Sequence, residues 1–366
     1  MENALLYFDV GLFFLNYLLL YFLEKKYSRR NWAAKPGFHE RWSKSAKPAL
    51  GGVGFIFMFV GAIFFQWYFF PGSVNWFLVA GIAMAFALGL VDDLTGLSPL
   101  IKFSGQLVCA AIVLLGINVI PIMGIDVWDK IITLFWVVGL MNSLNMLDNM
   151  DAAASVPALG ITVLFTMIAM ELQPELFPLF LFMSGSIAAF LFFNWPPSKL
   201  FMGDSGSLVL GLLLAFGAIQ FSWLSDYQHP SLHWYDRVGS TLLVFTIPLA
   251  DTLTVTINRL AHGISPARGG RDHSTHHLVY AGVKANYLPW VLATVVLLQL
   301  GTWFLFSSQK VYTLLHLPLP PRVGRVLAPH SLPAWYIGVI FFLCYFLAVF
   351  ILSRVNLSKG KYAYAK

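Results

Sequence analysis

Charged residues are scarce in this chain, and their scarcity excludes a soluble globular protein. Asp, Glu, Lys and Arg make up 11% of the 366 residues, whereas apolar residues make up 58% and aromatic residues 16%. The mean hydropathy is +0.73. Soluble domains carry roughly 25% charged residues, so this composition is that of a protein embedded in a lipid bilayer.

Cysteines and internal repeats are also lacking. Cys109 and Cys344 both lie in apolar segments and show neither a pairing pattern nor the spacing of metal ligands. No internal repeat is evident, so the inverted-repeat pattern of many secondary transporters is absent. The chain begins with acidic Glu2 and Asp9 instead of a basic stretch, which favours a retained first helix over a signal peptide.

Apolar runs of bilayer length are what the sequence has in abundance. About eleven are long enough to span a membrane as helices. They fall near residues 4–23, 49–70, 75–91, 101–119, 131–147, 155–171, 176–194, 205–222, 239–258, 286–306 and 333–353. We therefore expect an all-α, polytopic membrane protein that forms a single integral-membrane domain over residues 1–366.

Basic residues are unevenly distributed over the two sides that these spans define. Eighteen of the 23 Lys and Arg residues fall on one side, together with the C-terminus. Because positive residues accumulate on the cytoplasmic side of membrane proteins, that side is expected to be cytoplasmic and the N-terminus outside. The two long outer loops, 223–238 and 307–332, contain no cluster suited to chemistry and are interpreted as connectors.

Aspartates gather at the ends of the apolar segments, on the expected cytoplasmic side. They are Asp92, Asp93, Asp148, Asp151, Asp204 and Asp251. Adjacent carboxylates such as Asp92 and Asp93 repel each other at a membrane boundary, so a bound divalent cation is the simplest compensation. If this loop stood alone, we would instead interpret the Asp-Asp pair as the end of a helix in water, without a bound cation. Lys102 and Gln106 follow, one and two turns into the next helix.

The next two inner loops add further polar residues. If the helix before residue 148 continues, Asn145, Asp148 and Asp151 lie on one face, and an Asx-type helix end is an equally weighted alternative. Asp204 precedes the eighth span in a Gly-Ser-rich run, where it is expected to serve as a helix N-cap. Free N–H groups at such a helix start also suit a phosphate.

The last long inner loop, 259–286, gathers basic side chains. It contains Arg259, His262, Arg268, Arg271, Asp272, His273, His276 and His277. Guanidinium and imidazole groups together with glycines suit recognition of a pyrophosphate. A zinc pair of His273 and His277 is disfavoured because no cysteine is nearby and the surrounding acids favour a hard, oxygen-bound ion. For His262, an ordinary positive-inside residue is the favoured interpretation.

With these residues in order, the chain resembles the polyprenyl-phosphate N-acetylhexosamine-1-phosphate transferases, membrane enzymes that begin the synthesis of cell-envelope glycans. The resemblance spans roughly residues 45 to 280. The matching motifs are Pro48-Ala49-Leu50-Gly51-Gly52; Asp92-Asp93 with Lys102 and Gln106; Asn145-x-x-Asp148-x-x-Asp151; Asn194 with Phe201 to Ser207; and Pro248-x-x-Asp251 with Arg259, Gly263, Pro266 and His276-His277-Leu278. Five motifs in this order are specific, whereas any one alone is not.

The chain departs from the family pattern in two places. The family's second acidic motif has glycines where Asn149 and Ala152 stand here, which puts the backbone of that loop in question. The family's histidine block has a histidine at the position of Ser274, for which His273, one residue earlier, is the alternative.

The resemblance implies a reaction and its partners. An N-acetylhexosamine 1-phosphate, GlcNAc 1-phosphate foremost, would pass from a UDP-sugar to undecaprenyl phosphate and release UMP at the cytoplasmic face of the bacterial plasma membrane. Attack of phosphate on phosphate calls for neutralisation by Mg²⁺, with Mn²⁺ as the alternative cofactor. The implied partners are the UDP-N-acetylhexosamine, undecaprenyl phosphate and the bilayer, with a homodimer as an option and no nucleic acid.

The resemblance also divides the residues into roles. Asp204, Asp93 and Asp92 are expected to hold the metal, and Asp92, Asp93, Asp148 and Asp151 are the candidate catalytic residues. The candidate substrate-binding residues are Asn145, Lys102, Asn194, Asp251, Arg268, Arg271, His273, His276 and His277. For Asp251, the alternative is that it only braces the histidine loop and does not bind substrate. Direct attack by the lipid phosphate is favoured over a covalent aspartyl intermediate.

Two other functions are alternatives. Lipid I translocase, which uses UDP-MurNAc-pentapeptide, belongs to the same family, but its histidine block typically ends in an acidic residue, whereas Leu278 and Val279 follow here. A cation-coupled transporter would place its acids near the bilayer midplane on broken helices. The acids of this chain instead cluster at one side, and only Asp251 lies noticeably inside a span.

Overall fold

The described part of the chain is helical throughout. The computed structural model describes residues 2–27, 47–223, 234–306 and 334–361. Within these ranges the only β contact is an isolated parallel bridge between Ala49 and Phe201. The outer loop 307–332 and most of 223–238 fall outside the described residues, as do residues 28–46 of the first inner loop. The expected all-α class is confirmed.

The helices follow the apolar runs of the sequence. Their bounds are α1 (Glu2–Tyr27), α2 (Gly51–Phe69), α3 (Trp76–Thr95), α4 (Pro99–Leu114), α5 (Asp126–Leu147), α6 (Ser155–Leu172), α7 (Phe177–Asn194), α8 (Gly203–Ala218), η2 (Ile219–Trp223), α9 (Trp234–Val244), α10 (Thr246–Ala261), α11 (Ser274–Tyr280), η4 (Ala285–Tyr287), α12 (Leu288–Phe306) and α15 (Ala334–Ser358). Local signals set several starts: Asn75 accepts from Leu78 N at the start of α3, and Pro99 stands at the first position of α4.

Eight of the described helices are long and apolar enough to cross a membrane. This supports a polytopic membrane protein but not a count of eleven, since α1 and the shorter α4 are not among the eight. The span expected over 239–258 falls on a bent pair of helices, because α9 and α10 meet at 83°, and the pair forms either one broken span or a re-entrant loop. Pro248 lacks the N–H that would bond to Val244 O, so the helix cannot continue through this point.

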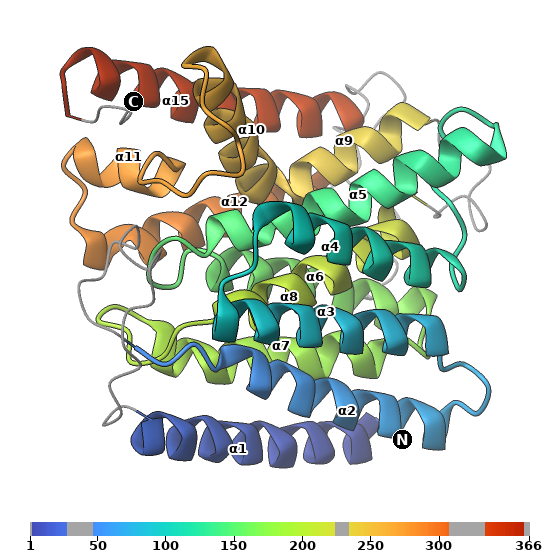
Figure 1. Ribbon diagram of the computed structural model, residues 1–366. Helices are drawn as coiled ribbons and strands as arrows, with labels where there is room; N and C mark the ends of the chain where they lie inside the picture. The colour runs from blue at the N-terminus through green and yellow to red at the C-terminus, as the bar shows by residue number, and fades with distance from the viewer. Residues whose placement is uncertain (1, 28–46, 224–233, 307–333, 362–366) are drawn as a thin grey trace, which may run out of the picture.

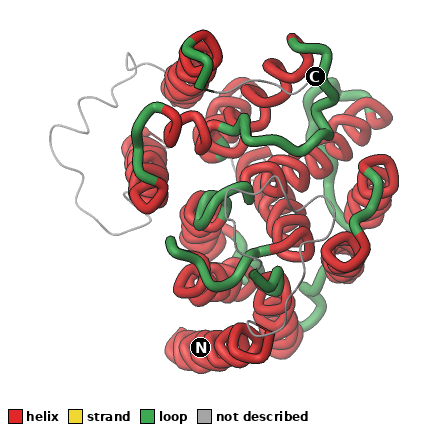
Figure 2. The backbone as a smooth tube through the Cα atoms, turned by 60° about the vertical axis from the view of Figure 1, so that its left-hand side comes forward, coloured by secondary structure: helices red, strands yellow, loops and turns green. Residues whose placement is uncertain are grey.

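Helix α8 lies at the centre of the bundle. It packs against α2, α3 and α5, and every residue of it except Asp204 is buried. Figures 1 and 2 show the long helices roughly side by side, with α1 at one edge and α15 at the opposite edge. In Figure 1, α10 runs across the others, and α15 contacts α9, α10 and the short helix α11.

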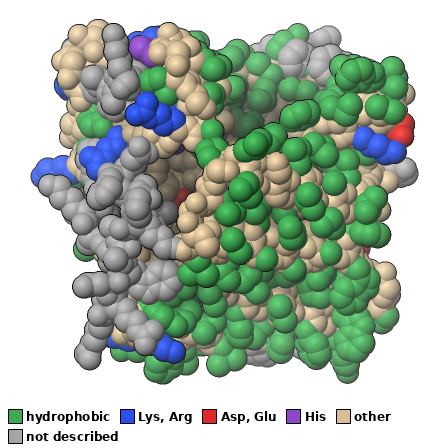
Figure 3. Space-filling view, in the orientation of Figure 1, with side chains coloured by type: hydrophobic (Ala, Val, Ile, Leu, Met, Phe, Trp, Pro, Cys, Tyr) green, Lys and Arg blue, Asp and Glu red, His purple; other side chains and the backbone are tan. Residues whose placement is uncertain are grey.

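Apolar side chains cover most of the face shown in Figure 3, as suits contact with lipid. Lys and Arg side chains gather on its left, where Figure 1 shows the C-terminal end of α3. On the same side Figure 3 shows a hollow in which an acidic side chain is visible. The two ends of the bundle thus differ in charge, and the assignment of the basic end to the cytoplasm stays a prediction.

Candidate active site

A short backbone bridge brings the start of α2 beside the start of α8. Phe201 N donates to Pro48 O at 3.0 Å, and Gly51 N donates to Phe201 O at 3.1 Å. A side chain at Gly52 is excluded, since its Cβ would lie 2.6 Å from Gly206 N. The motif that begins at Pro48 therefore joins two helix starts and fixes where the chain enters α8.

The carboxylate of Asp93, on α3, closes the start of α8. It accepts hydrogen bonds from Asp204 N at 2.8 Å, from Ser205 N at 3.0 Å and from Ser205 Oγ at 2.8 Å. Gly203, at φ 76°, makes the turn that precedes these groups. The expectation that Asp204 is the N-cap is wrong. Met202 occupies the N-cap position without a side-chain bond, and Asp93 supplies the missing acceptor from a neighbouring helix.

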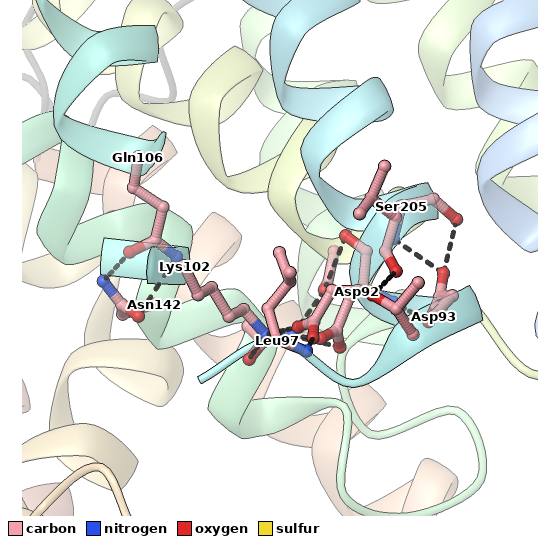
Figure 4. A network of polar contacts seen from close by, with 12 residues as sticks. Asp92, Asp93, Leu97, Lys102, Gln106, Asn142 and Ser205 are labelled. Carbon is pink, nitrogen blue, oxygen red and sulfur yellow. Dashed lines mark hydrogen bonds and ion pairs between the residues drawn. The ribbon is translucent and has the colours of Figure 1, made fainter. Parts of the chain in front are cut away.

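Asp92 and Asp204 both contact the ammonium group of Lys102, and Figure 4 shows Asp92 between Lys102 and Asp93. Lys102 Nζ lies 2.9 Å from Asp92 Oδ2 and also contacts Asp204 Oδ2. Asn145 Nδ2 donates to Asp204 Oδ1 at 2.7 Å, and Asn145 Oδ1 accepts from Lys102 at 3.1 Å. Residues from α3, α4, α5 and α8 thus converge on one polar cluster, and Asn145 belongs to it although the sequence grouped this residue with Asp148 and Asp151.

This cluster offers hard oxygen ligands to a cation. Two carboxylates, Asp92 and Asp204, already hold a positive charge between them, the ammonium of Lys102. Asp92 Oδ1 accepts a hydrogen bond from Leu97 N at 2.6 Å, and Asp92 Oδ2 faces the Lys102 ammonium. Across the described residues, no group of three or more His, Cys, Asp or Glu side chains could hold a metal. A two-carboxylate site fits Mg²⁺, which binds few carboxylates and completes its shell with water and phosphate oxygens.

The second acidic motif does not continue as a helix. α5 ends at Leu147, and Asp148 has ψ 44°. The expected common helical face of Asn145, Asp148 and Asp151 is therefore wrong, and the Asx-type helix end is the arrangement found. Asn149 Nδ2 donates to Met146 O at 2.9 Å, a local bond of the kind that competes with a further helical turn.

Asn194 holds the loop of residues 148–154 from α7. Its Oδ1 accepts from Ala152 N at 2.9 Å and from Ser155 Oγ at 3.0 Å, and its Nδ2 donates to Leu200 O at 3.1 Å. Ala152 has φ 60°, a left-handed conformation in keeping with the glycine that the family has there. Asn194 is 1% exposed, so its contacts join two loops, and its expected role in substrate binding stays a prediction.

Asp151 accepts hydrogen bonds from the loop that follows α7. It accepts from Ser198 N at 3.0 Å and from Ser198 Oγ at 2.7 Å. Lys47 Nζ donates to Ser198 Oγ at 2.9 Å and lies 4.0 Å from Asp151 Oδ2. The two carboxylates of the second motif are thus separated: Asp148 stands at the end of α5, whereas Asp151 is engaged with the 195–202 loop.

Asp251 braces the histidine helix α11. This buried carboxylate of α10 accepts from His273 Nδ1 at 2.9 Å, from Ser274 N at 2.7 Å and from Ser274 Oγ at 2.6 Å. These contacts match the bracing alternative. His273 is the N-cap residue of α11, and its Nδ1 contacts the Asp251 carboxylate.

A buried ion pair fixes the loop before α11. Arg259 Nε and Nη2 donate to the two oxygens of Asp272 at 2.8 and 2.7 Å, and Nη1 donates to Pro266 O at 2.7 Å. Arg268 and Arg271, by contrast, are exposed on the same loop. The loop that this ion pair fixes therefore presents two guanidinium groups at the surface, which suits binding of phosphates from solution.

His276 and His277 are buried in α11. Burial lowers the pKa of His277 to about 4 and holds the pKa of His276 well below its usual value. Both imidazoles are therefore neutral near pH 7 and offer hydrogen bonds instead of charge. Asn356 of α15 donates from Nδ2 to His277 O at 2.9 Å, so the last helix helps to hold this histidine in place.

Some residues of the site were missed in the sequence. Lys47 and Ser205 adjoin or belong to motifs, and their place beside Pro48 and Asp204 was the available signal. Ser198 and Asn356 gave no signal. A single serine in a loop is ordinary, and Asn356 is 79 residues from the histidine that it contacts.

Comparison with known proteins finds similarity over the part of the chain that carries these residues. The model of the family described as glycosyl transferase family 4 matches residues 75–222, which include the aspartates of α3, of the α5 end and of α8. A Bacillus subtilis protein named "Probable undecaprenyl-phosphate N-acetylglucosaminyl 1-phosphate transferase" is 26% identical over 244 residues, 64% of each chain.

Two further relatives are more similar over shorter segments. Decaprenyl-phosphate N-acetylglucosaminephosphotransferase of Mycolicibacterium smegmatis is 30% identical over 229 residues, 56% of each chain. Phospho-N-acetylmuramoyl-pentapeptide-transferase of Listeria monocytogenes is 34% identical over 205 residues, 48% of this chain and 61% of that protein. The chain spans less than two thirds of the length of these relatives. Residues 75–222 of this chain are thus similar to glycosyl transferase family 4, and the chain is similar over about half to two thirds of its length to proteins named as polyprenyl-phosphate sugar-1-phosphate transferases.

Proposed function

We propose that this protein transfers N-acetylhexosamine 1-phosphate, with GlcNAc 1-phosphate as the first candidate, from a UDP-sugar to undecaprenyl or a similar polyprenyl phosphate. The observation that carries the proposal is the cluster of Asp92, Lys102 and Asp204 at the partly buried start of α8. The products are UMP and a sugar linked to the lipid through a pyrophosphate. Such a product begins a cell-envelope glycan, such as lipopolysaccharide or a cell-wall polysaccharide.

The reaction is a phosphoryl transfer in which the main obstacle is charge. An oxygen of the lipid phosphate attacks the phosphorus that carries the sugar, and the bond from this phosphorus to the oxygen of UMP breaks. A phosphate monoester has a second pKa near 6, so the attacking group is mostly dianionic at pH 7 and needs no strong base. Mg²⁺, with Mn²⁺ as the alternative, held by Asp92 and Asp204 would neutralise charge on the phosphates.

The chain's own residues serve the two substrates from different elements. Lys102 places a fixed positive charge beside the carboxylates, where the phosphates meet. Asp148, at the end of α5, is the candidate for contact with the sugar nucleotide or for a base. Arg268 and Arg271 are exposed and suited to the phosphates of the donor and of the leaving UMP. Asp93 holds the start of α8, so that Asp204 keeps its place.

The location of the cluster suits a reaction between a soluble and a lipid-bound substrate. The acidic residues lie at helix ends, where a lipid phosphate at the membrane surface and a donor from solution can meet. We place the cluster at the cytoplasmic face of the bacterial plasma membrane, because the basic residues of the sequence accumulate on its side.

Transfer can be measured directly with the purified full-length protein in detergent. The protein is incubated with undecaprenyl phosphate, Mg²⁺ and radiolabelled UDP-GlcNAc, UDP-GalNAc or UDP-MurNAc-pentapeptide. Label is expected to enter the lipid phase from UDP-GlcNAc, with release of UMP. Absence of transfer from every donor contradicts the proposed function.

Matched variants distinguish the loss of a carboxylate in the polar cluster from the general effect of removing a negative charge. Asp204→Asn is expected to abolish transfer, whereas Asp126→Asn, which neutralises an exposed aspartate paired with Lys130, is expected to leave it unchanged. Removal of divalent cations with EDTA is expected to stop the reaction, and added Mg²⁺ or Mn²⁺ to restore it. Activity that survives both Asp204→Asn and EDTA would contradict a metal at this site.

A second substrate is favoured by one comparison. The relative from Listeria monocytogenes is named for transfer of phospho-N-acetylmuramoyl-pentapeptide. Transfer from the pentapeptide donor but not from UDP-GlcNAc would assign that reaction to this chain.

A further inference from the structure

The loop after α5 and the histidine helix α11 are joined by a short hydrogen bond. Thr275 Oγ1 donates to Asn149 Oδ1 at 2.6 Å, across 126 residues of sequence. The other end of the Asn149 side chain donates to Met146 O at 2.9 Å, in the last turn of α5. The Asn149 amide is therefore held at both ends, and it cannot turn without breaking one of the two bonds.

This bond connects the two groups of functional side chains. Directly before Met146, Asn145 donates to Asp204 in the polar cluster. On the other side, Thr275 is buried and directly precedes His276 and His277. The end of α5 is thus in contact with both the acidic cluster and the histidine helix.

The other anchors of α11 lie in different directions. Asp251 of α10 holds Ser274, and Asn356 of α15 holds the carbonyl of His277. These bonds fix α11 to the C-terminal helices, whereas the bond from Thr275 fixes it to the loop that carries Asp148. Asn149 stands where the family motif has glycine, which has no side chain to accept the bond.

We infer that the hydrogen bond between Asn149 and Thr275 is a positioning link that holds α11 and the Asp148 loop together around the sugar-nucleotide donor. The inference rests on the proposed function. The donor carries two phosphates and a sugar, so it is long enough to contact the α5 end and α11 at once. The lipid acceptor presents a single phosphate, which the cluster of Asp92 and Lys102 can bind without a contribution from α11.

Kinetics of the full-length enzyme test this link. Thr275→Val keeps the shape of the side chain and removes the hydroxyl, and Asn149→Gly removes the acceptor. Each variant is expected to raise the KM for UDP-GlcNAc about fivefold, as the loss of one neutral hydrogen bond does, and to leave the KM for undecaprenyl phosphate unchanged. The double variant is expected to be no worse than the single variants, because both remove the same bond.

Two controls distinguish positioning from general loss of stability. Thr275→Ser keeps the hydroxyl and is expected to restore the donor KM to within about twofold of wild type. Thr166→Val removes a comparable hydroxyl that bonds to Thr162 O within α6 and lies 3.3 Å from Ser184 Oγ of α7, and it is expected to change neither KM. An unchanged donor KM in Thr275→Val, or an equal rise in both KM values, overturns the inference.

Hydrogen–deuterium exchange provides a test that does not depend on activity. In the full-length protein without substrates, Thr275→Val is expected to speed amide exchange in residues 274–280, and Thr166→Val is not. Exchange in α11 that stays at the wild-type rate overturns the link. If the wild-type protein transfers no sugar, the proposed function fails, and this exchange measurement alone decides the link.

Discussion

The adjacent residues Asp92 and Asp93 have different contacts although they are chemically alike. Asp92 shares the Lys102 ammonium with Asp204, whereas Asp93 receives three hydrogen bonds from the start of α8. Successive residues on a helix point about 100° apart, so one carboxylate turns toward α4 and the other toward α8. The pair therefore combines a cation-binding group with a helix cap.

This difference predicts different stabilities for two variants. Asp93→Asn places an amide nitrogen among N–H donors, and loss of the cap is expected to lower the free energy of unfolding by roughly 1–2 kcal/mol. Asp204→Asn keeps the bonds at the start of α8 and is expected to leave the melting temperature close to wild type. Thermal unfolding of both purified variants, with transfer measured in parallel, checks this. Equal melting temperatures would argue against the capping role.

His277 predicts a pH dependence of stability. Burial lowers its pKa from 6.5 in the unfolded chain to about 4 in the folded protein. The folded state thus keeps the imidazole neutral where the unfolded state binds a proton, so stability is complete above pH 6.5 and falls as the pH drops toward about 4. Melting curves between these values should show the decline. It should be shallower in His277→Gln, and unchanged in His262→Gln, which alters an exposed histidine.

At the scale of helices, close contact between α3 and α8 sets the polar cluster. Gly89 of α3 lies against the backbone of Asp204 and Ser205, where a Cβ would overlap their atoms. Since Asp93 lies one turn further along α3, the distance between these helices determines whether it reaches the start of α8. Small residues at this crossing are thus part of the site although they carry no chemistry.

Gly89→Ala is therefore expected to impair both stability and transfer. The methyl group must push α3 away from α8, and overpacking of this kind costs typically 1–3 kcal/mol. The matched control is Gly139→Ala on α5, where a Cβ meets nothing within 4 Å and alanine favours the helix. Melting temperature and initial transfer rate measured on both variants provide the test. A Gly89→Ala protein as stable and active as the control would contradict the packing argument.

The helices were easier to predict than the loops that carry the site. Apolar runs determine helices locally, and each expected span falls on a helix or a bent pair of helices. The end of α5 could not be placed in the same way, because Asn149 is held by Thr275, 126 residues away. The role of Asp93 was hidden for the same reason, since its partners at Asp204 and Ser205 come from a distant part of the chain.

At the scale of the whole molecule, the uneven charge predicts the orientation in the membrane. Lys359, near the end of α15, is expected to face the cytoplasm, and Lys130, near the start of α5, the outside; both are exposed. A membrane-impermeant amine reagent should therefore modify Lys359 only in inverted vesicles and Lys130 only in right-side-out vesicles. Peptide mass spectrometry reads both sites in one sample. The reverse pattern would place the polar cluster on the outer face.

The central position of α8 has a consequence for biosynthesis. Helices α2, α3 and α5 leave the ribosome before α8, yet α8 fills the space between them. The earlier helices must therefore remain apart, or separate again, until residues 203–218 have entered the bilayer. Asp204 arrives with this late helix, so the nascent chain carries Asp92 and Lys102 for more than a hundred residues of synthesis before the cluster can close.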